Sequence, residues 1–179
     1  MNISDFDYDL PEDRIAQTPI EPRDTARLMV LNPKDGAIEH RQFYELGTYL
    51  KKGDVLIFND TRVIPARLIG TRSHTGGRVE VFLLRQIDKD QWEALVKPGK
   101  KVRVGSIIHF GDELSCEILA HTDFGGRIVR FIYDGVFEEI LDRLGTMPLP
   151  PYIHEKLADR ERYQTVYSRV KGSAAAPTA

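Results

Sequence analysis

The chain of 179 residues contains a single cysteine, Cys116, so it holds no internal disulfide framework. One cysteine in a chain of this length is typical of a reducing compartment. No apolar run approaches the ~20 residues that a membrane-spanning helix needs. The N-terminus carries Asp5, Asp7 and Asp9 and lacks the apolar segment of a signal peptide. We therefore expect a soluble, cytoplasmic protein that does not enter a membrane.

Motifs for metals and nucleotides are also missing. The five histidines show no metal-ligand spacing, and Cys116 has no nearby partner. Neither a Walker phosphate loop nor a Gly-x-Gly-x-x-Gly motif occurs, so a Rossmann-type nucleotide site has no support. We expect no metal and no bound cofactor, and we interpret Cys116 as a small core residue.

The charge is distributed unevenly along the chain. The net charge is −2, and 41% of the residues are hydrophobic, which suits one compact domain or two small ones. Residues 62–109 contain 10 Lys/Arg and 4 Asp/Glu, whereas residues 1–61 contain 7 and 12. The basic middle block could offer a face to a polyanion such as nucleic acid, which the overall charge does not reveal.

The first sixty residues mix helix and strand patterns. Arg27–Leu31 predicts a strand, and the Asn32–Gly36 turn leads into a partner strand near Ile38. The apolar spacing within residues 43–50 predicts a helix. The apolar run Val55–Phe58 predicts a buried strand, so this part of the chain has α/β character.

From Val63 to Asp134 the pattern changes to short β-rich runs separated by turns. About six strands without helices indicate a small antiparallel barrel or sandwich. An amphipathic helix then ends at Gly145, and the proline-rich Met147–Tyr152 forms a stiff connector. The β block looks inserted into an α/β scaffold. We predict a scaffold of residues 1–61 and 151–179, with residues 62–150 as the insertion.

Four polar residues follow the expected Val55–Phe58 strand, namely Asn59, Asp60, Thr61 and Arg62. A buried strand that ends in donors and acceptors positions a binding site on a rigid element. The same residues also suit an Asx-type turn, in which Asn59 or Asp60 bonds its own backbone and Arg62 pairs with Asp60. Local chemistry leaves both interpretations open.

Two loops carry exposed basic groups. The segment from Arg14 to Arg23 combines two arginines with two prolines, and its guanidinium groups could recognise phosphate or pair with neighbouring acids. Lys100 and Lys101 lie on an expected hairpin turn, which could grip a nucleic-acid backbone or be a solvated tip. For each loop, the sequence alone does not decide between a binding role and an ordinary surface loop.

Two segments near the end of the chain also have two interpretations. If Asp159–Tyr167 is helical, Tyr163 and Tyr167 share a face on which a base could stack. Alternatively, both tyrosines pack on the core and the arginines between them pair outward. The small residues of Gly172–Ala179 let a ligand approach the backbone, or they form a disordered tail.

Taken together, these segments resemble the S-adenosylmethionine:tRNA ribosyltransferase-isomerases of queuosine biosynthesis. The resemblance implies an α/β barrel-like domain, discontinuous in sequence, with a small antiparallel β-barrel of about six strands inserted into it. The similar stretches run in family order along the whole chain: Arg14–Pro19, Phe58–Arg67, Leu95–Pro98, Met147–Ile153, Asp159–Tyr167 and Gly172–Ala179.

The resemblance also implies a reaction. The family moves the ribosyl part of S-adenosylmethionine onto the aminomethyl group of a 7-deazaguanine base at the wobble position of tRNAs for Asp, Asn, His and Tyr. The sugar rearranges to give epoxyqueuosine, while adenine and methionine leave. S-adenosylmethionine is then a consumed co-substrate, and its sulfonium group makes the adjacent 5′ carbon acidic enough for a general base to start the rearrangement.

On this basis each candidate residue receives an expected role. Asp60 is the leading general base or cation partner, with Arg62 as the second catalytic residue. The expected substrate-binding residues are Asn59, Thr61, Ser173, Ala174, Ala175, Ala176, Pro177 and Thr178. Further candidates for contact with tRNA or its base are Arg14, Arg23, Lys100, Lys101, Arg162, Tyr163 and Tyr167. We expect a monomer.

One departure from the family limits these expectations. Family members continue from the small-residue run into a Gly-Leu-His-Phe segment that does not follow here, so the chain is expected to carry about the first half of the enzyme. A non-catalytic tRNA-binding β-barrel is therefore the alternative function. A conventional methyltransferase is disfavoured because the chain lacks a glycine-rich strand-to-helix turn.

Overall fold

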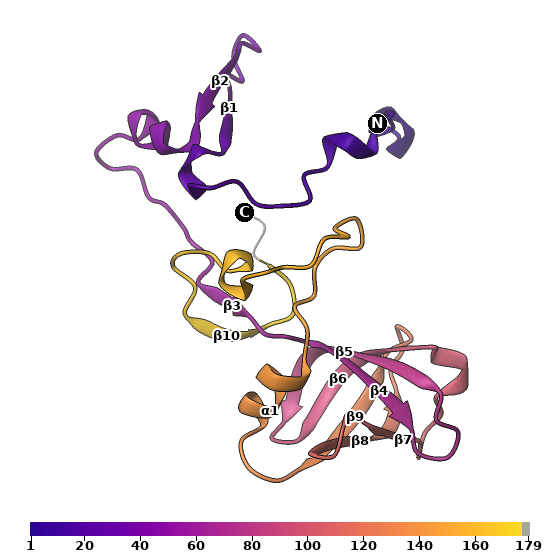
Figure 1. Ribbon diagram of the computed structural model, residues 1–179. Coiled ribbons are helices and arrows are strands. Elements are labelled where there is room, and N and C mark those ends of the chain that lie inside the picture. The colour runs from indigo at the N-terminus through magenta and orange to yellow at the C-terminus, as the bar shows by residue number, and fades with distance from the viewer. Residues whose placement is uncertain (177–179) are drawn as a thin grey trace. The chain divides into compact units, whose positions relative to one another are not determined.

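The computed structural model describes residues 1–176 and contains two units, each defined by its internal contacts (Figure 1). The first unit combines Met1–Phe58 with Pro150–Ala158. The second combines Asn59–Leu149 with the chain from Asp159 onward. Contact-defined units are not by themselves folding domains, so the division at residues 61 and 150 stays a prediction.

The first unit is built from short elements. The predicted hairpin of β1 and β2 is confirmed, because the two strands pair antiparallel from Arg27↔Gln42 to Leu31↔Ile38. Its turn closes through the Asn32 amide, which donates to the Ala37 carbonyl at 2.9 Å, and Gly36 takes a φ of +73° there. The elements are η1 (Ile3–Phe6), η2 (Glu12–Arg14), η3 (Arg23–Thr25), β1 (Arg27–Leu31), β2 (Ile38–Gln42) and η4 (Phe43–Tyr49).

Two predictions for this unit need correction. The helix expected at residues 43–50 forms as the 3-10 helix η4. The strand predicted at Val55–Phe58 was wrong, because these residues form no strand and Ile57 is 93% exposed. A strand needs a neighbour for its backbone groups, and an apolar sequence does not supply one.

A closed antiparallel barrel dominates the second unit, which confirms the six predicted strands. The strands are β4 (Arg67–Arg72), β5 (Arg78–Asp88), β6 (Gln91–Lys97), β7 (Ile107–His109), β8 (Leu114–His121) and β9 (Arg127–Tyr133). They close in the order β4-β5-β6-β9-β8-β7. Alternate residues point inward, as in β5, where Val79, Val81 and Leu83 are fully buried. Closure leaves the barrel without free sheet edges.

The predicted amphipathic helix is confirmed as α1 (Phe137–Leu144), which covers one end of the barrel (Figure 1). The Phe137 ring packs against Phe131 at 5.0 Å and Trp92 at 5.8 Å between centroids. The helix ends at Gly145, where a Cβ would lie 2.0 Å from the Pro65 carbonyl oxygen. Only glycine permits this close approach, so the chain after α1 lies directly against the entrance to β4.

Four shorter elements complete the second unit: β3 (Thr61–Val63), η5 (Gly99–Lys101), η6 (Arg160–Tyr163) and β10 (Val170–Ser173). Strands β3 and β10 form a two-stranded parallel sheet. This parallel pair provides the α/β part of the fold next to the barrel. Within residues 1–176, no helix is long and apolar enough to cross a membrane.

Candidate active site

Strands β3 and β10 bring together two of the segments that the sequence singles out. Thr61 pairs with Val170, Arg62 with Lys171 and Val63 with Ser173. Arg62, the last residue of the polar segment 59–62, therefore lies beside Lys171, directly before the small-residue run, although more than a hundred residues separate the two segments. Gly172 lies at a β-bulge, and its φ of +130° is a backbone conformation that residues other than glycine rarely adopt.

Asn59 and Asp60 form the turn that leads into β3. The Asn59 Oδ1 atom accepts the Thr61 amide at 3.0 Å and the Thr61 hydroxyl at 2.6 Å, which is the Asx turn foreseen as an alternative. The Asp60 carboxylate accepts a hydrogen bond from Arg169 at 2.8 Å, and its side chain is 40% exposed. The Asp60 carbonyl also accepts the Arg169 and Val170 amides. Asp60 is thus anchored to the chain that leads into β10.

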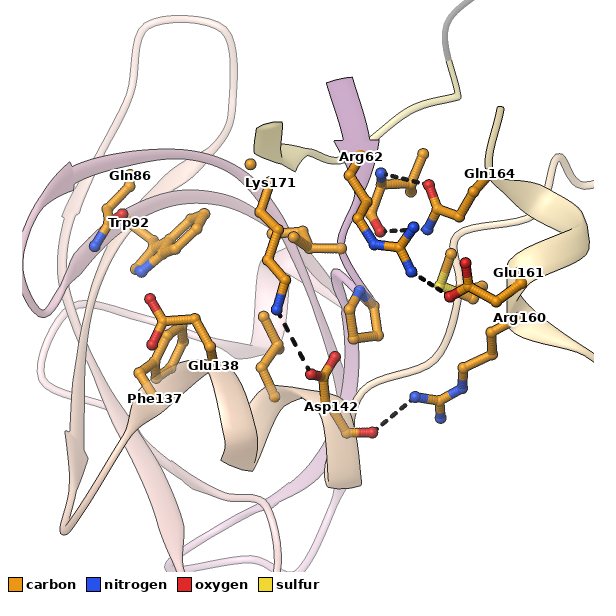
Figure 2. Close-up of a pocket in the computed structure, with 16 residues that line it drawn as sticks. Arg62, Gln86, Trp92, Phe137, Glu138, Asp142, Arg160, Glu161, Gln164 and Lys171 are labelled. Atoms are coloured by element: carbon orange, nitrogen blue, oxygen red, sulfur yellow. Dashed lines mark hydrogen bonds and ion pairs between the residues drawn. The ribbon is translucent and has the colours of Figure 1, made fainter. Parts of the chain in front are cut away.

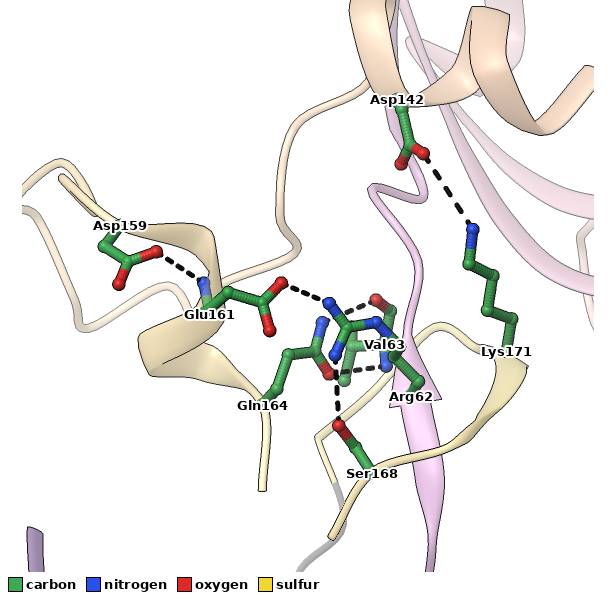
Figure 3. A network of polar contacts seen from close by, with 8 residues as sticks. All are labelled: Arg62, Val63, Asp142, Asp159, Glu161, Gln164, Ser168 and Lys171. Atoms are coloured by element: carbon green, nitrogen blue, oxygen red, sulfur yellow. Dashed lines mark hydrogen bonds and ion pairs between the residues drawn. The ribbon is translucent and has the colours of Figure 1, made fainter. Parts of the chain in front are cut away.

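Arg62 does not pair with Asp60, so that part of the turn interpretation was wrong. Its guanidinium forms an ion pair with Glu161 and donates to the Ser168 hydroxyl at 3.2 Å (Figure 3). Glu161 is itself oriented by its place in η6, where its amide donates to the Asp159 carboxylate. The guanidinium is therefore held in one orientation by groups from a single segment, residues 159–168.

Gln164 holds β3 from the side opposite β10. Its amide accepts the Val63 N–H at 2.9 Å and donates to the Val63 carbonyl at 2.8 Å, and the residue is only 6% exposed (Figure 3). Backbone groups of successive strand residues point to alternate sides of the strand. The Asp60 carbonyl and the Ile64 amide bond to the segment that contains β10, so the Val63 amide and carbonyl point to the other side. A side-chain amide repeats the donor and acceptor of a peptide, so Gln164 substitutes for a third strand.

The small-residue run folds back on itself. The Ser173 hydroxyl donates to the Ala175 carbonyl at 2.6 Å and accepts the Ala175 amide at 3.2 Å. Ala174 packs against the barrel core, and Ala176 is half-buried. As far as Ala176, the run therefore makes contacts with itself and with the barrel core. The predicted substrate-binding residues Pro177 and Thr178 lie outside the described residues.

A pocket of about 350 Å³ opens beside this sheet, within the second unit (Figure 2). Arg62 and Gly172 line it at the sheet, and Trp92 and Phe137 line it at the barrel and α1. Lys171 lies 4.0 Å from the Asp142 carboxylate, and Arg160 donates to the backbone carbonyls of Asp142 and Gly145. The pocket therefore combines an apolar wall with charged groups of both signs, which is a common composition for a small-molecule site.

The remaining candidates lie on other elements than the β3–β10 sheet. Arg14 and Arg23 lie in the first unit, where Arg14 is 3.9 Å from Asp13. Lys100 and Lys101 are exposed in η5, and the expected hairpin there was wrong because the flanking β6 and β7 do not pair.

The prediction that Tyr163 and Tyr167 share one face of a helix was also wrong. Helix η6 is a 3-10 helix that ends at Tyr163, so Tyr167 does not lie one helical turn above it. Tyr163 donates its hydroxyl to the Pro148 carbonyl at 3.4 Å, and Tyr167 is exposed. Arg162 is half-buried in the same short helix.

Two ionisable groups in the barrel have shifted pKa values. Burial raises the pKa of the Cys116 thiol to about 12, which fits its place in the core. The hydrogen bond from the Tyr133 hydroxyl to Asp90, together with burial, raises the pKa of Tyr133 to about 12. Among residues 1–176, no group of three or more His, Cys, Asp or Glu side chains is arranged to hold a metal ion.

Sequence reasoning missed several residues at the site. Gln164, Glu161 and Arg169 hold the strand end, whereas Trp92 and Glu138 line the pocket. The resemblance covered Asp159–Tyr167, so Gln164 lay in a segment already singled out, but its burial shows only in the structure. Nothing local marks Trp92 or Glu138, because the pocket forms only when the barrel, α1 and β10 meet.

The fold defines the chain as an α/β protein with an inserted six-stranded antiparallel β-barrel. The family model described as queuosine biosynthesis protein matches residues 3–179, and the chain belongs to this family.

Two proteins named S-adenosylmethionine:tRNA ribosyltransferase-isomerase are similar over the whole chain. The one from Symbiobacterium thermophilum is 61% identical, and the one from Acetivibrio thermocellus is 58% identical. In both cases the match covers 100% of this chain and 53% of the relative, so the chain spans about half the length of the curated relatives it matches. The crystal structure of an S-adenosylmethionine tRNA ribosyltransferase from Thermotoga maritima is 39% identical. That match covers 84% of this chain and 52% of that one, with a TM-score of 0.40.

Proposed function

We propose that the chain contributes to a ribosyltransferase-isomerase that acts on tRNA. In this reaction the ribosyl group of S-adenosylmethionine is transferred to a 7-aminomethyl-7-deazaguanine base at the wobble position and isomerised to give epoxyqueuosine. Adenine and methionine leave, and S-adenosylmethionine is consumed as a co-substrate without a metal or a resident cofactor. The proposed tRNA partners are those for Asp, Asn, His and Tyr, and the proposed setting is a cytoplasmic monomer.

The pairing of β3 with β10 is the observation that carries this proposal. It pairs Arg62 with Lys171 and Val63 with Ser173, so the two segments that the family resemblance assigns to catalysis and to S-adenosylmethionine share one sheet, which Asn59–Arg62 enters through β3 and Ser173–Ala176 leaves through β10. Small side chains leave the backbone of the second segment open to a ligand. The proposal therefore draws both substrate-binding segments from one two-stranded sheet.

Within this site, Asp60 and Arg62 receive different roles. A carboxylate near a sulfonium lowers the energy of the cation, and it can also take the proton that the sulfonium makes acidic. Asp60 is partly exposed and is held by Arg169, so its second oxygen remains accessible to a substrate. Arg62 is fixed by Glu161 and Ser168, which makes it a positioned cation for an anionic or polar substrate group.

A non-catalytic tRNA-binding module is the second candidate. The excess of basic residues in 62–109 favours it, because these residues build much of the barrel and could contact phosphates. The two candidates differ in whether S-adenosylmethionine is consumed.

Adenine release tests the proposal directly. S-adenosylmethionine would be incubated with tRNA that carries the deazaguanine precursor, using this chain and a version extended to the length of its relatives. Mass spectrometry of the tRNA would follow. We expect the extended protein to release adenine and to add the ribosyl-derived mass. Retained tRNA binding without adenine release from either protein would favour the binding module.

A further inference from the structure

We infer that the pocket between the barrel, α1 and β10 binds the guanine-type base of the tRNA substrate, and that Trp92 and Glu138 recognise its edge. The inference rests on the proposed function, which supplies a 7-deazaguanine base as the acceptor. It adds a base-binding site at residues that the family resemblance does not assign to any role.

The size and position of the pocket suit a base. Its volume of about 350 Å³ lies at the lower end of the roughly 300–1,000 Å³ found for small-molecule sites. Phe137 and Leu141 provide an apolar wall, and Arg62 and Gly172 lie at the end nearest the candidate active site. A base bound here would therefore be close to the segments proposed to hold S-adenosylmethionine.

The indole end of the pocket carries a hydrogen-bond donor without a partner. Trp92 is 5% exposed, and its Nε1–H makes no hydrogen bond with any described residue. Buried polar groups in proteins nearly always have a partner, so an orphaned donor in a pocket wall points to a ligand. The exposed side chains of Gln86 and Glu138 lie next to the indole, and a ligand that moves the Gln86 side chain aside reaches this N–H beside the Glu138 carboxylate (Figure 2).

Glu138 supplies the complementary acceptor. The other carboxylates of the pocket are engaged, because Glu161 pairs with Arg62 and Asp142 with Lys171. Glu138 makes no hydrogen bond or ion pair with a described residue, and Figure 2 shows its carboxylate at the indole end of the pocket. An ionised carboxylate only accepts hydrogen bonds, and an indole N–H only donates them.

This order of donor and acceptor distinguishes guanine from adenine. A guanine-type ring presents an oxygen that accepts from Trp92, followed by two N–H donors that suit the Glu138 carboxylate. Adenine presents an amino group toward the indole N–H and a ring nitrogen lone pair toward the carboxylate, so both contacts are repulsive. The pocket therefore suits the deazaguanine of tRNA and not the adenine of S-adenosylmethionine. An unpaired loop base can enter such a pocket after it leaves the stack.

Trp92 is the only tryptophan in the chain, so intrinsic fluorescence reports on this pocket alone. The 179-residue chain would be titrated with free 7-aminomethyl-7-deazaguanine, and separately with adenine. We expect saturable quenching by the deazaguanine and none by adenine. Glu138→Gln should weaken binding about tenfold or more, because it replaces a charged acceptor by an amide.

Glu139→Gln is the matched control, since Glu139 is exposed on the same helix and does not line the pocket. Trp92→Phe, followed by calorimetry, should weaken binding severalfold while it keeps an aromatic ring. Thermal melts of each variant would show that the fold is retained. Equal affinities of Glu138→Gln and Glu139→Gln would overturn the inference, and so would quenching by adenine as strong as that by the deazaguanine.

The two proposals can fail separately. If the extended protein releases no adenine but base binding still depends on Glu138, the proposed function fails and the base site stands. If adenine is released while the base leaves Trp92 fluorescence unchanged and Glu138→Gln leaves the KM for tRNA unchanged, the base site fails.

Discussion

Single side chains at the entrance to β3 have distinct partners, and these partners separate structural from chemical roles. Asn59 is used within its own turn, and Arg62 is held in place by Glu161 and Ser168. Asp60 is different, because it combines one ion pair with a partly exposed carboxylate. At the scale of the residue, Asp60 is therefore the group of this turn that is best placed to meet a substrate.

Asp60→Asn in a protein of the relatives' length should lower turnover by roughly 10²-fold or more, the usual effect of losing a general base. Stability should change by less than about 1 kcal/mol, because the ion pair with Arg169 is exposed. Arg169→Gln is the control, since it removes the ion pair and keeps the carboxylate. Steady-state adenine release measures the turnover of both variants. Normal turnover of Asp60→Asn would eliminate Asp60 as the base, and equal losses in both variants would assign the effect to the ion pair.

At the scale of the element, β3 is a short strand that depends on its neighbours. Three residues cannot form a stable strand alone, and one side of β3 is covered by β10. The other side is closed by the amide of Gln164, which satisfies both backbone groups of Val63. The position of the candidate active site therefore depends on the pairing with β10 and, on the other side, on one buried side chain, Gln164.

Gln164→Ala should lower the free energy of unfolding by roughly 1–3 kcal/mol, because it leaves the Val63 N–H and carbonyl without partners. Gln164→Glu should cost at least as much at neutral pH, since it keeps the acceptor for the N–H but places a buried carboxylate against the Val63 carbonyl. Urea unfolding, followed by Trp92 fluorescence, measures both. Gln86→Ala is the exposed control and should stay within about 0.5 kcal/mol of the unsubstituted protein. If Gln164→Ala behaves like Gln86→Ala, Gln164 does not hold β3.

The turn η5 carries the two lysines proposed to contact tRNA. Reversing Lys100 and Lys101 to glutamate should weaken tRNA binding and reduce the slope of log K against log salt by roughly 1.4–1.8, if each lysine contacts one phosphate. Filter binding at several salt concentrations measures the slope. Lys51 and Lys52 form a second exposed lysine pair, in the first unit, and their reversal controls for net charge. Unchanged affinity after reversal of Lys100 and Lys101 would remove η5 from the tRNA interface.

Which elements could be predicted from the sequence depends on how local their causes are. The barrel strands were predictable because inward residues alternate, as in β5, and turns separate the runs. The pairing of β3 with β10 joins segments more than a hundred residues apart, so no local pattern contains it. The family resemblance pointed to both segments of the site, but the roles of Gln164, Trp92 and Glu138 depend on tertiary packing alone.

At the scale of the whole molecule, the apolar run Val55–Phe58 is unusual for its exposure. Val55 is 83% exposed and Ile57 is 93% exposed, although the sequence has the composition of a buried strand. Contiguous exposed apolar residues mark a surface that a binding partner, a ligand or further protein chain covers. The chain spans 53% of the length of its relatives, and residues present in those longer proteins would have room to pair with this segment.

Cysteine labelling tests this expectation. Ile57→Cys should react rapidly with a maleimide in the 179-residue chain and at least about tenfold more slowly in a version extended to the length of the relatives. This factor corresponds to ~1.4 kcal/mol of local opening. Cys116 should stay silent in both, because it is buried and its thiol pKa is raised to about 12. Lys34→Cys, in the exposed β1–β2 turn, should react equally in both proteins. Equal labelling of Ile57→Cys in the two proteins would show that the longer chain leaves Val55–Phe58 uncovered.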